Sequence, residues 1–150
     1  MTVEGSCPVP VPDEQSAPFW EAAARGELAL ARCASCSRFV HPPAPVCPEC
    51  GSTDPAFAFH PVDGHGVIRS WTVLRQSSLA GFAADLPIVL VDVALELGAD
   101  LATARDTDVR LIGRLLDGSA APLHVGDGVR VVFEQLADGV AVPAFTLAPR

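Results

Sequence analysis

Two closely spaced cysteine pairs constrain the fold of this chain more than any other feature of its sequence. Cys33 and Cys36 form the first pair, Cys47 and Cys50 form the second, and ten residues separate the two. Two residues between cysteines allow both sulfur atoms of one tight turn to face a single ion. Two such turns on facing hairpins supply four thiolates at the corners of a tetrahedron. The spacing therefore predicts a zinc ribbon, or a rubredoxin-like pair of knuckles.

The predicted site is closed, because four protein thiolates leave no coordination position for water or substrate. A closed site of this kind is structural rather than catalytic. Tetrahedral thiolate sites hold zinc or iron, so we expect one structural zinc ion and keep iron as the alternative. Gly51 follows the second pair and suits the left-handed backbone that lets turn amides donate to sulfur. Ser37 follows the first pair, a departure that we expect to add some strain.

The composition narrows both the cellular setting and the chemistry. The chain has 150 residues, of which 49% are hydrophobic, and a formal charge of −8. Its basic residues are all arginine, which excludes lysine Schiff-base chemistry and a lysine-bearing phosphate loop within this chain. We find neither a secretory leader nor an apolar run of membrane-spanning length. We therefore expect a cytoplasmic protein without membrane contact, in which cysteines indicate metal binding before disulfides.

The first 31 residues predict a tail and a short helix. Prolines alternate with valines over residues 8–12, which predicts an extended and loosely held segment. Ser16 is expected as the N-cap, with Pro18 in the first turn, and Gly26 suits the position just after the helix. The residues expected on the apolar stripe of this helix are Phe19, Trp20, Ala23 and Ala24.

From residue 57 onward the pattern changes to strand-length apolar segments that are separated by turn signals. The five expected strands span residues 67–76, 88–97, 109–116, 129–136 and 140–147. Five strands with these connections are typical of a small Greek-key barrel of the OB type. We therefore predict a mainly β protein in three parts. These are an N-terminal tail and helix over 1–31, a rubredoxin-like zinc ribbon over 32–55 and a five-stranded OB-fold barrel over 56–150.

The remaining reactive side chains give weaker signals. Cys7 in the tail predicts a free thiol, and His41 lies between two cysteine pairs that already satisfy one ion. His60 and His65 flank a turn that we expect to be solvated. The sequence contains no hydrolase serine elbow, metal-hydrolase helix or dinucleotide glycine motif. We therefore predict no catalytic residues and no activity from the chain alone.

Several short motifs occur in a fixed order along most of the chain. Their positions are Pro18, Phe19, Trp20, Gly26, Glu27, Leu28, Cys33, Cys36, Pro42, Pro43, Cys47, Pro48, Cys50, Gly51, Gly64, Gly66, Val67, Ser70, Thr72, Pro87, Ile88, Val89 and residues 129–134. This order resembles the domain-of-unknown-function 35 family over roughly residues 18 to 147. Members of that family join a rubredoxin-like zinc ribbon to an OB fold, so the resemblance implies the same architecture.

The resemblance also implies a function. Family members act as non-catalytic subunits beside a thiolase-superfamily enzyme or a MaoC-like enoyl-CoA hydratase. The settings include thiolase and acyltransferase complexes and an aldolase that shortens steroid side chains. In these assemblies the OB unit helps to form the acyl-CoA site. The resemblance therefore implies a hetero-oligomer in which acyl-CoA is shared with the partner enzyme.

Two other classes of function compete with this one. Zinc ribbons and OB barrels also bind single-stranded nucleic acid, which requires positive charge and aromatic stacking platforms. The expected second and third barrel strands contain no aromatic residue. Their two arginines, Arg110 and Arg114, supply too little positive charge in a chain with a net charge of −8. We therefore predict no nucleic-acid binding. An iron-loaded, rubredoxin-like electron carrier is the other alternative, but it gives the barrel no role.

The connection between the first two barrel strands, residues 77–86, is the expected docking segment. It carries Leu79, Phe82 and Leu86, apolar side chains that normally need a covering partner when they are exposed. Arg69 and Arg75 on the preceding strand are expected nearby, where an arginine can meet a CoA phosphate. We expect these five residues to contact the partner or acyl-CoA. The alternative is that Phe82 folds back and plugs the end of the barrel.

Overall fold

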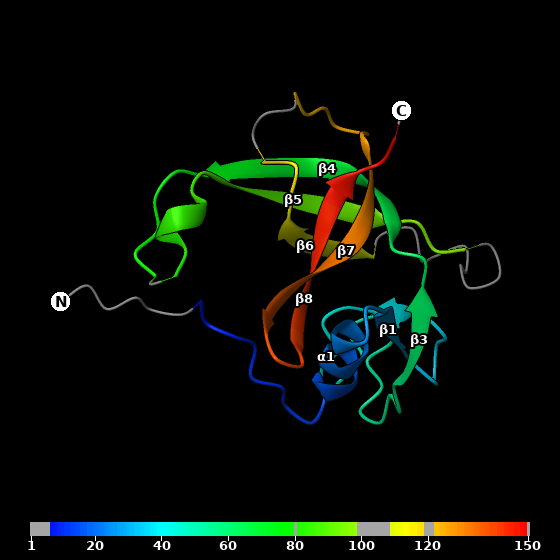
Figure 1. Ribbon diagram of the computed structural model, residues 1–150. Coiled ribbons are helices and arrows are strands. Elements are labelled where there is room, and N and C mark those ends of the chain that lie inside the picture. The colour runs from blue at the N-terminus through cyan, green and yellow to red at the C-terminus, as the bar shows by residue number, and fades with distance from the viewer. Residues whose placement is uncertain (1–6, 80, 99–108, 119–121, 150) are drawn as a thin grey trace.

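The computed structural model describes residues 7–79, 81–98, 109–118 and 122–149. In this part of the chain, one α-helix precedes eight strands that divide between two antiparallel sheets. The smaller sheet has the strand order β2-β1-β3, and the larger has the order β6-β5-β4-β7-β8. Figure 1 shows the larger sheet curled above the helix and the smaller sheet. The expected fold class is confirmed: a mainly β chain in which a helix and a zinc ribbon precede an OB-like domain.

The helix α1 spans Ala17–Ala24 and begins and ends where the sequence predicts. Ser16 occupies the N-cap position, but its side chain caps no helix amide. Its hydroxyl donates instead to Asp13 Oδ1 at 2.6 Å. Gly26 lies just beyond the helix with φ +76°, the left-handed conformation that glycine adopts without strain. No helix in the described ranges is long and apolar enough to cross a membrane.

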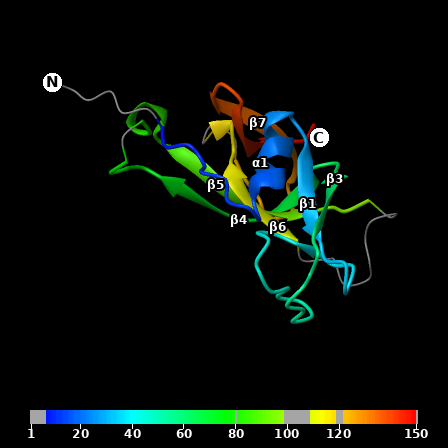
Figure 2. The same cartoon turned by 90° about the horizontal axis from the view of Figure 1, so that it is seen from below.

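The apolar stripe of α1 differs in detail from the prediction. Phe19 and Ala23 are buried as expected and Trp20 is half-buried, whereas Ala24 is exposed and Ala22 is buried in its place. The stripe is displaced because α1 packs against two neighbours, β1 and β8, rather than against one surface. Figure 2 shows the helix beside β1 and in front of the barrel strands.

The smaller sheet is built from β1 (Leu28–Arg32), β2 (Phe39–Val40) and β3 (Ala58–Val62). Four consecutive residues of β1 are buried, from Leu28 to Ala31, because both of its faces are covered. β3 falls in the range predicted for the barrel (56–150). β1 falls in the range predicted for the tail and helix (1–31), except for Arg32, where the predicted ribbon begins. The two strands nevertheless pair with one another, from Leu28 opposite Val62 to Arg32 opposite Ala58. The ribbon sheet therefore crosses both predicted domain boundaries.

The larger sheet contains the five expected strands, and its register closes it into a barrel. They are β4 (His65–Leu74), β5 (Ile88–Leu95), β6 (Arg110–Arg114), β7 (Gly128–Ala137) and β8 (Val140–Leu147). β4 pairs with β5 on one side and β7 on the other. A parallel bridge between Leu115 and Phe145 joins the β6 end to β8. This closure removes the open edges that a flat five-stranded sheet would leave.

One hydrophobic core serves both sheets and the helix. Phe145 of β8, Val91 of β5 and Leu30 of β1 are all fully buried and belong to the same cluster as Phe19 of α1. Gly113 of β6 permits a close approach, because a Cβ at this position would lie 2.8 Å from the Phe145 ring. The ribbon and the barrel are therefore packed through a common interior.

Candidate metal centre

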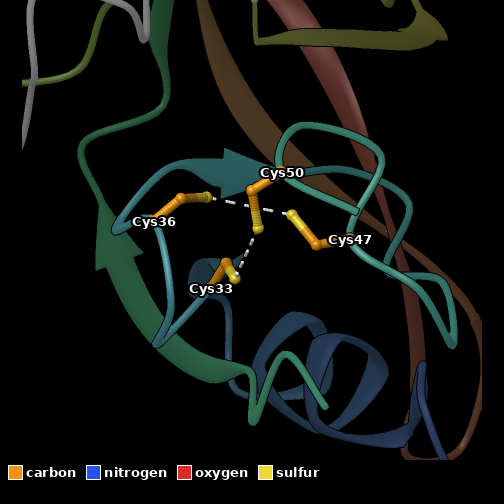
Figure 3. Close-up of side chains that lie close together, drawn as sticks. All are labelled: Cys33, Cys36, Cys47 and Cys50. Atoms are coloured by element: carbon orange, nitrogen blue, oxygen red, sulfur yellow. Dashed lines mark hydrogen bonds between the residues drawn. The ribbon is translucent and has the colours of Figure 1, made fainter. Parts of the chain in front are cut away.

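The four predicted ligand residues come together at one point between the two cysteine loops. All four Sγ atoms lie within 4.8 Å of one another. The Cys33–Cys50 and Cys36–Cys47 sulfur pairs are each separated by 3.9 Å. Dashed lines mark these two pairs in Figure 3. A tetrahedron with zinc–sulfur bonds of about 2.3 Å has edges of about 3.8 Å. The donor set and its spacing therefore fit one tetrahedral thiolate-bound ion.

Each cysteine pair is held by the same local turn. The Ser37 amide donates to the Cys33 carbonyl at 2.8 Å, and the Gly51 amide donates to the Cys47 carbonyl at the same distance. Both closing residues have positive φ, +60° for Ser37 and +72° for Gly51. The two knuckles therefore repeat one backbone conformation. Glycine adopts it freely, whereas a serine pays a steric penalty from its Cβ, which is the strain expected at Ser37.

Two side-chain contacts join the knuckles to each other. Ser35 Oγ donates to Ser52 Oγ at 3.1 Å. Arg38 forms an ion pair with Glu49. In each contact one partner belongs to the first knuckle and the other to the second. These bonds hold the two halves of the site in register across the metal position.

The metal-free thiols differ in their acidity. Burial is the largest influence and raises the pKa of Cys33, but backbone N–H donation from Cys36 and Ser35 and the adjacent thiols outweigh it, leaving the pKa at about 7. Burial again dominates at Cys36, where neighbouring thiols add to it and raise the pKa to about 12. A divalent cation offsets such differences, because it stabilises every thiolate that it binds. Metal binding at this site is therefore expected to release protons.

Burial closes the site from the interior side. Cys33 and Cys47 are buried, Cys36 is half-buried and Cys50 is exposed. His41, the conceivable additional ligand, lies with its ring against Phe19 at a centroid distance of 4.8 Å and is outside the thiolate group. Burial lowers the pKa of His41 and favours its neutral form. A four-thiolate centre of this kind organises the backbone and offers no position for a reacting molecule.

The structure separates the predicted docking residues into two groups. Arg69 and Arg75 are exposed on and just after β4, and Leu79 is 60% exposed in the loop that follows. Phe82 and Leu86 are half-buried at either end of the short 3₁₀ turn η1 (Ala83–Asp85). Phe82 is not among the described residues of the core cluster. It lines a surface groove instead.

Sequence reasoning missed this groove, which we call the outer groove. It encloses about 510 Å³ between the N-terminal tail, the β4–β5 loop and the outer face of the barrel. Its lining includes residues 7–10 of the tail, Leu79 and Phe82 of the loop, and Leu90, Leu136 and Val142 of the barrel. One sequence signal pointed to the groove. Leu90 of β5 and Leu136 of β7 are apolar residues at positions where the alternation of each strand places side chains on the outer face of the barrel. Nothing local indicated that the tail would lie over them.

An arginine that sequence reasoning treated as free surface charge holds the loop wall of the outer groove. Arg114 of β6 donates to Asp85 of η1 at 2.9 Å and to Glu134 of β7 at 3.1 Å. Arg110 is similarly engaged, with Asp92 at 2.9 Å. Both arginines that counted as positive charge for nucleic-acid binding are therefore neutralised by carboxylates.

A four-thiolate knuckle pair on a small sheet, packed against a closed five-stranded barrel, defines a zinc-ribbon and OB-fold protein. Two family models match the chain in the same order. Residues 20–56 match the model described as "ChsH2, rubredoxin-like zinc ribbon domain". Residues 59–134 match the model described as "ChsH2, C-terminal OB-fold domain". The chain therefore belongs to the ChsH2 family of zinc-ribbon and OB-fold proteins.

Known structures and sequences agree with this assignment. A chain of a solved structure described as "Ltp2-ChsH2(DUF35) aldolase" is 26% identical, with a TM-score of 0.73, over 92% of this chain and 98% of that one. A Sulfolobus solfataricus protein of unknown function from the DUF35 family shares the fold at 11% identity, with a TM-score of 0.54, over 90% of this chain and 86% of its own. The resemblance to the domain-of-unknown-function 35 family is confirmed.

A curated relative is larger than this chain. It is a Thermomonospora curvata protein named "Probable enoyl-CoA hydratase alpha subunit", 34% identical over 140 residues. The match covers 93% of this chain but only 38% of the relative. The sequence similarity is therefore confined to a part of that protein.

Proposed function

We propose that the chain is a non-catalytic accessory subunit that binds an acyl-CoA enzyme and helps to form its acyl-CoA site. The observation that carries this proposal is the structural likeness to a chain of the Ltp2–ChsH2 aldolase, which extends over 98% of that chain. The likeness therefore extends over nearly all of that chain, ribbon and barrel together. The hydratase subunit name of the curated relative supports an acyl-CoA partner.

The finer identity of the partner is part of the proposal. A thiolase-superfamily enzyme, such as a thiolase, an acyltransferase or a steroid side-chain aldolase, fits the aldolase neighbour. A MaoC-like hydratase fits the name of the curated relative. In both cases the ribbon and barrel act as a rigid attachment, and the bond-making groups belong to the partner.

We propose zinc as the resident ion and Cys33, Cys36, Cys47 and Cys50 as its ligands. The sulfur spacing and the match to a zinc-ribbon model support this assignment. Bound zinc supplies a structural cross-link between the knuckles rather than a reactive centre. Iron is the alternative occupant of the same four thiolates. Elemental analysis of protein purified from its native host distinguishes the two ions.

Partner contact is assigned to the five residues predicted from sequence: Arg69, Arg75, Leu79, Phe82 and Leu86. The exposure of Leu79 and of the two arginines supports this assignment. Substitution of Phe82 by Asp is expected to abolish co-purification with the enzyme while metal content and secondary structure persist, because aromatic anchors dominate interfaces. Arg25→Ala, a change at the exposed C-cap of α1 and outside the predicted contact residues, is the control. Normal binding and turnover with Phe82→Asp would contradict the assignment.

Binding of single-stranded nucleic acid is the weaker candidate. The ion pairs of Arg110 and Arg114 reduce the positive charge available on the barrel, and strands β5 and β6 carry no aromatic side chain. We expect no salt-sensitive shift of single-stranded DNA or RNA in a low-salt mobility assay. Micromolar binding that weakens steeply with salt would favour this candidate instead.

Co-expression tests the main proposal. The chain is produced alone, with a thiolase-like enzyme and with a MaoC-like hydratase from its native host. We expect a stable complex with one of them on gel filtration, acyl-CoA turnover that depends on that enzyme, and no turnover from the chain alone. Turnover of acyl-CoA by the isolated, zinc-loaded chain would refute the non-catalytic assignment. Absence of a complex with either enzyme would refute the accessory role.

A further inference from the structure

The N-terminal tail forms one wall of the outer groove. Residues 7–10 line it, opposite Phe82 and above the apolar floor formed by Leu90, Leu136 and Val142. Figure 2 shows the tail running alongside β5 and β6 toward the β4–β5 loop. The tail therefore covers an apolar surface that would otherwise face water.

The attachment of this tail is weak. Pro8, Pro10 and Pro12 have no amide proton to donate. No backbone hydrogen bond joins residues 7–12 to the rest of the described chain. One side-chain bond does, from Cys7 Sγ to the Gly81 carbonyl at 3.1 Å. Side-chain packing therefore holds the tail on the groove.

The opposite wall is held more firmly. Arg114 fixes Asp85 at 2.9 Å and Glu134 at 3.1 Å, and charge-assisted bonds of this kind are about twice as strong as neutral ones. These bonds tie the β4–β5 loop to the barrel on a route independent of the tail. We therefore expect the tail to dissociate from the groove more readily than the β4–β5 loop, which keeps Phe82 in place.

We propose that residues 7–12 are a displaceable cover of the outer groove, and that an extended apolar segment of the partner enzyme takes their place. This inference rests on the proposed accessory function. An extended segment fits because the present occupant is itself extended and lies there without strand pairing. The groove also holds two carboxylates, Asp85 and Glu134, against one arginine. This balance favours a partner segment that carries a basic residue beside its apolar ones.

Cys7 provides a native probe of the cover. In the zinc-loaded protein the other four cysteines are ligands, so a neutral alkylating reagent such as N-ethylmaleimide reports chiefly on Cys7. Cys7 is half-buried with the tail in place, so its labelling rate rises with the fraction of molecules in which the tail has left the groove. The apparent affinity for the partner rises with that same fraction, because only the open form exposes the floor. The labelling rate and the affinity are therefore expected to change in the same direction when the tail is loosened.

Two valines of the tail make a matched pair of variants. Val9 lines the groove and is 43% exposed, whereas Val11 is 89% exposed. Val9→Asp is expected to raise the Cys7 labelling rate about fivefold, because roughly half of a valine's apolar burial is lost. Val11→Asp adds the same charge only two residues further along the tail. It is expected to change the Cys7 labelling rate less than twofold, because Val11 is already exposed. Equal Cys7 labelling rates in the two variants would overturn the proposal that the tail is held in the groove by Val9.

The closing experiment adds the partner enzyme to the same variants of the full zinc-loaded chain. We expect Val9→Asp to bind the enzyme more tightly than Val11→Asp, and we expect saturating enzyme to accelerate Cys7 labelling of the wild-type chain. Binding of both variants with equal affinity, or an enzyme that protects Cys7, would overturn this inference and leave the accessory function intact. Failure of every variant to bind either enzyme would instead refute the accessory function itself.

Discussion

The two knuckles of the metal centre offer a direct test of backbone strain, because they share one conformation but not one residue type. Ser37 and Gly51 close equivalent turns with φ +60° and +72°. A left-handed non-glycine residue costs about 1–2 kcal/mol. A glycine introduced there also lowers the free energy of unfolding by about 0.4–1 kcal/mol, because glycine has more conformational freedom in the unfolded chain. Ser37→Gly is therefore expected to stabilise the protein by about 0.5–1 kcal/mol.

The reciprocal change should have the opposite sign. A Cβ added at Gly51 meets no atom within 4 Å, so Gly51→Ser carries the backbone penalty without a clash. We expect it to destabilise the protein by about 1 kcal/mol. The two variants then differ by about 1.5–2 kcal/mol, or about 3–8 °C in Tm for a domain of this size.

Equilibrium urea unfolding of the zinc-loaded proteins measures this difference. Ser78→Gly is the control, because Ser78 is exposed and is not among the described residues with positive φ. It carries the unfolded-state penalty of glycine without any relief of strain, and is expected to be neutral or slightly destabilising. A Ser37→Gly protein no more stable than Ser78→Gly would refute the argument from strain.

Three further perturbations test the core and the centre. Gly113→Ala is expected to destabilise the barrel by about 1–3 kcal/mol in a thermal melt, because its Cβ would lie 2.8 Å from the Phe145 ring. Gly98→Ala is the control, and its Tm should not change, because a Cβ at residue 98 meets no atom within 4 Å. Burial lowers the pKa of His41, so stability should fall as the pH drops below about 6.5, where the unfolded chain takes up a proton that the fold disfavours. His41→Asn should remove that part of the slope in urea titrations at several pH values. Chelation of the metal, or Cys47→Ser, should unfold the ribbon and lower the near-ultraviolet circular dichroism signal, because metal binding supplies much of the folding free energy; an unchanged spectrum would contradict the structural role of the ion.

The barrel strands were predictable because each carries a strong local signal. In β5, Val89, Val91, Val93 and Leu95 alternate inward at period two, which is the pattern of a strand with one buried face. The four cysteines were equally clear, since their spacing has few other uses. The predicted strands differ from the observed ones mainly at their ends, where β4 begins at His65 and β6 stops at Arg114.

The outer groove could not be predicted, because it depends on contacts between residues far apart in the sequence. Arg114 reaches Asp85 and Glu134 across three different elements. No local pattern distinguishes a solvated arginine from a paired one. The alternating prolines and valines of the tail predict an extended segment, but not the surface on which it lies. Similarly, the boundary at residue 56 was drawn where the pattern changes, whereas β3 pairs back to β1 across it.

The connection between metal centre and barrel follows from the same pairing. Cys33 lies directly after β1, whose residues are buried against α1, and α1 also packs on β8 of the barrel. Phe19 of α1 joins the common core and lies 4.8 Å from the ring of His41 in the ribbon. An ion that holds the knuckles therefore also holds the end of β1. Through β1 it restrains the helix α1, which packs against the barrel strand β8. This gives a physical reason for the proposed metal in a chain whose proposed partner contacts lie on the barrel, because the ribbon determines how rigidly that barrel is held.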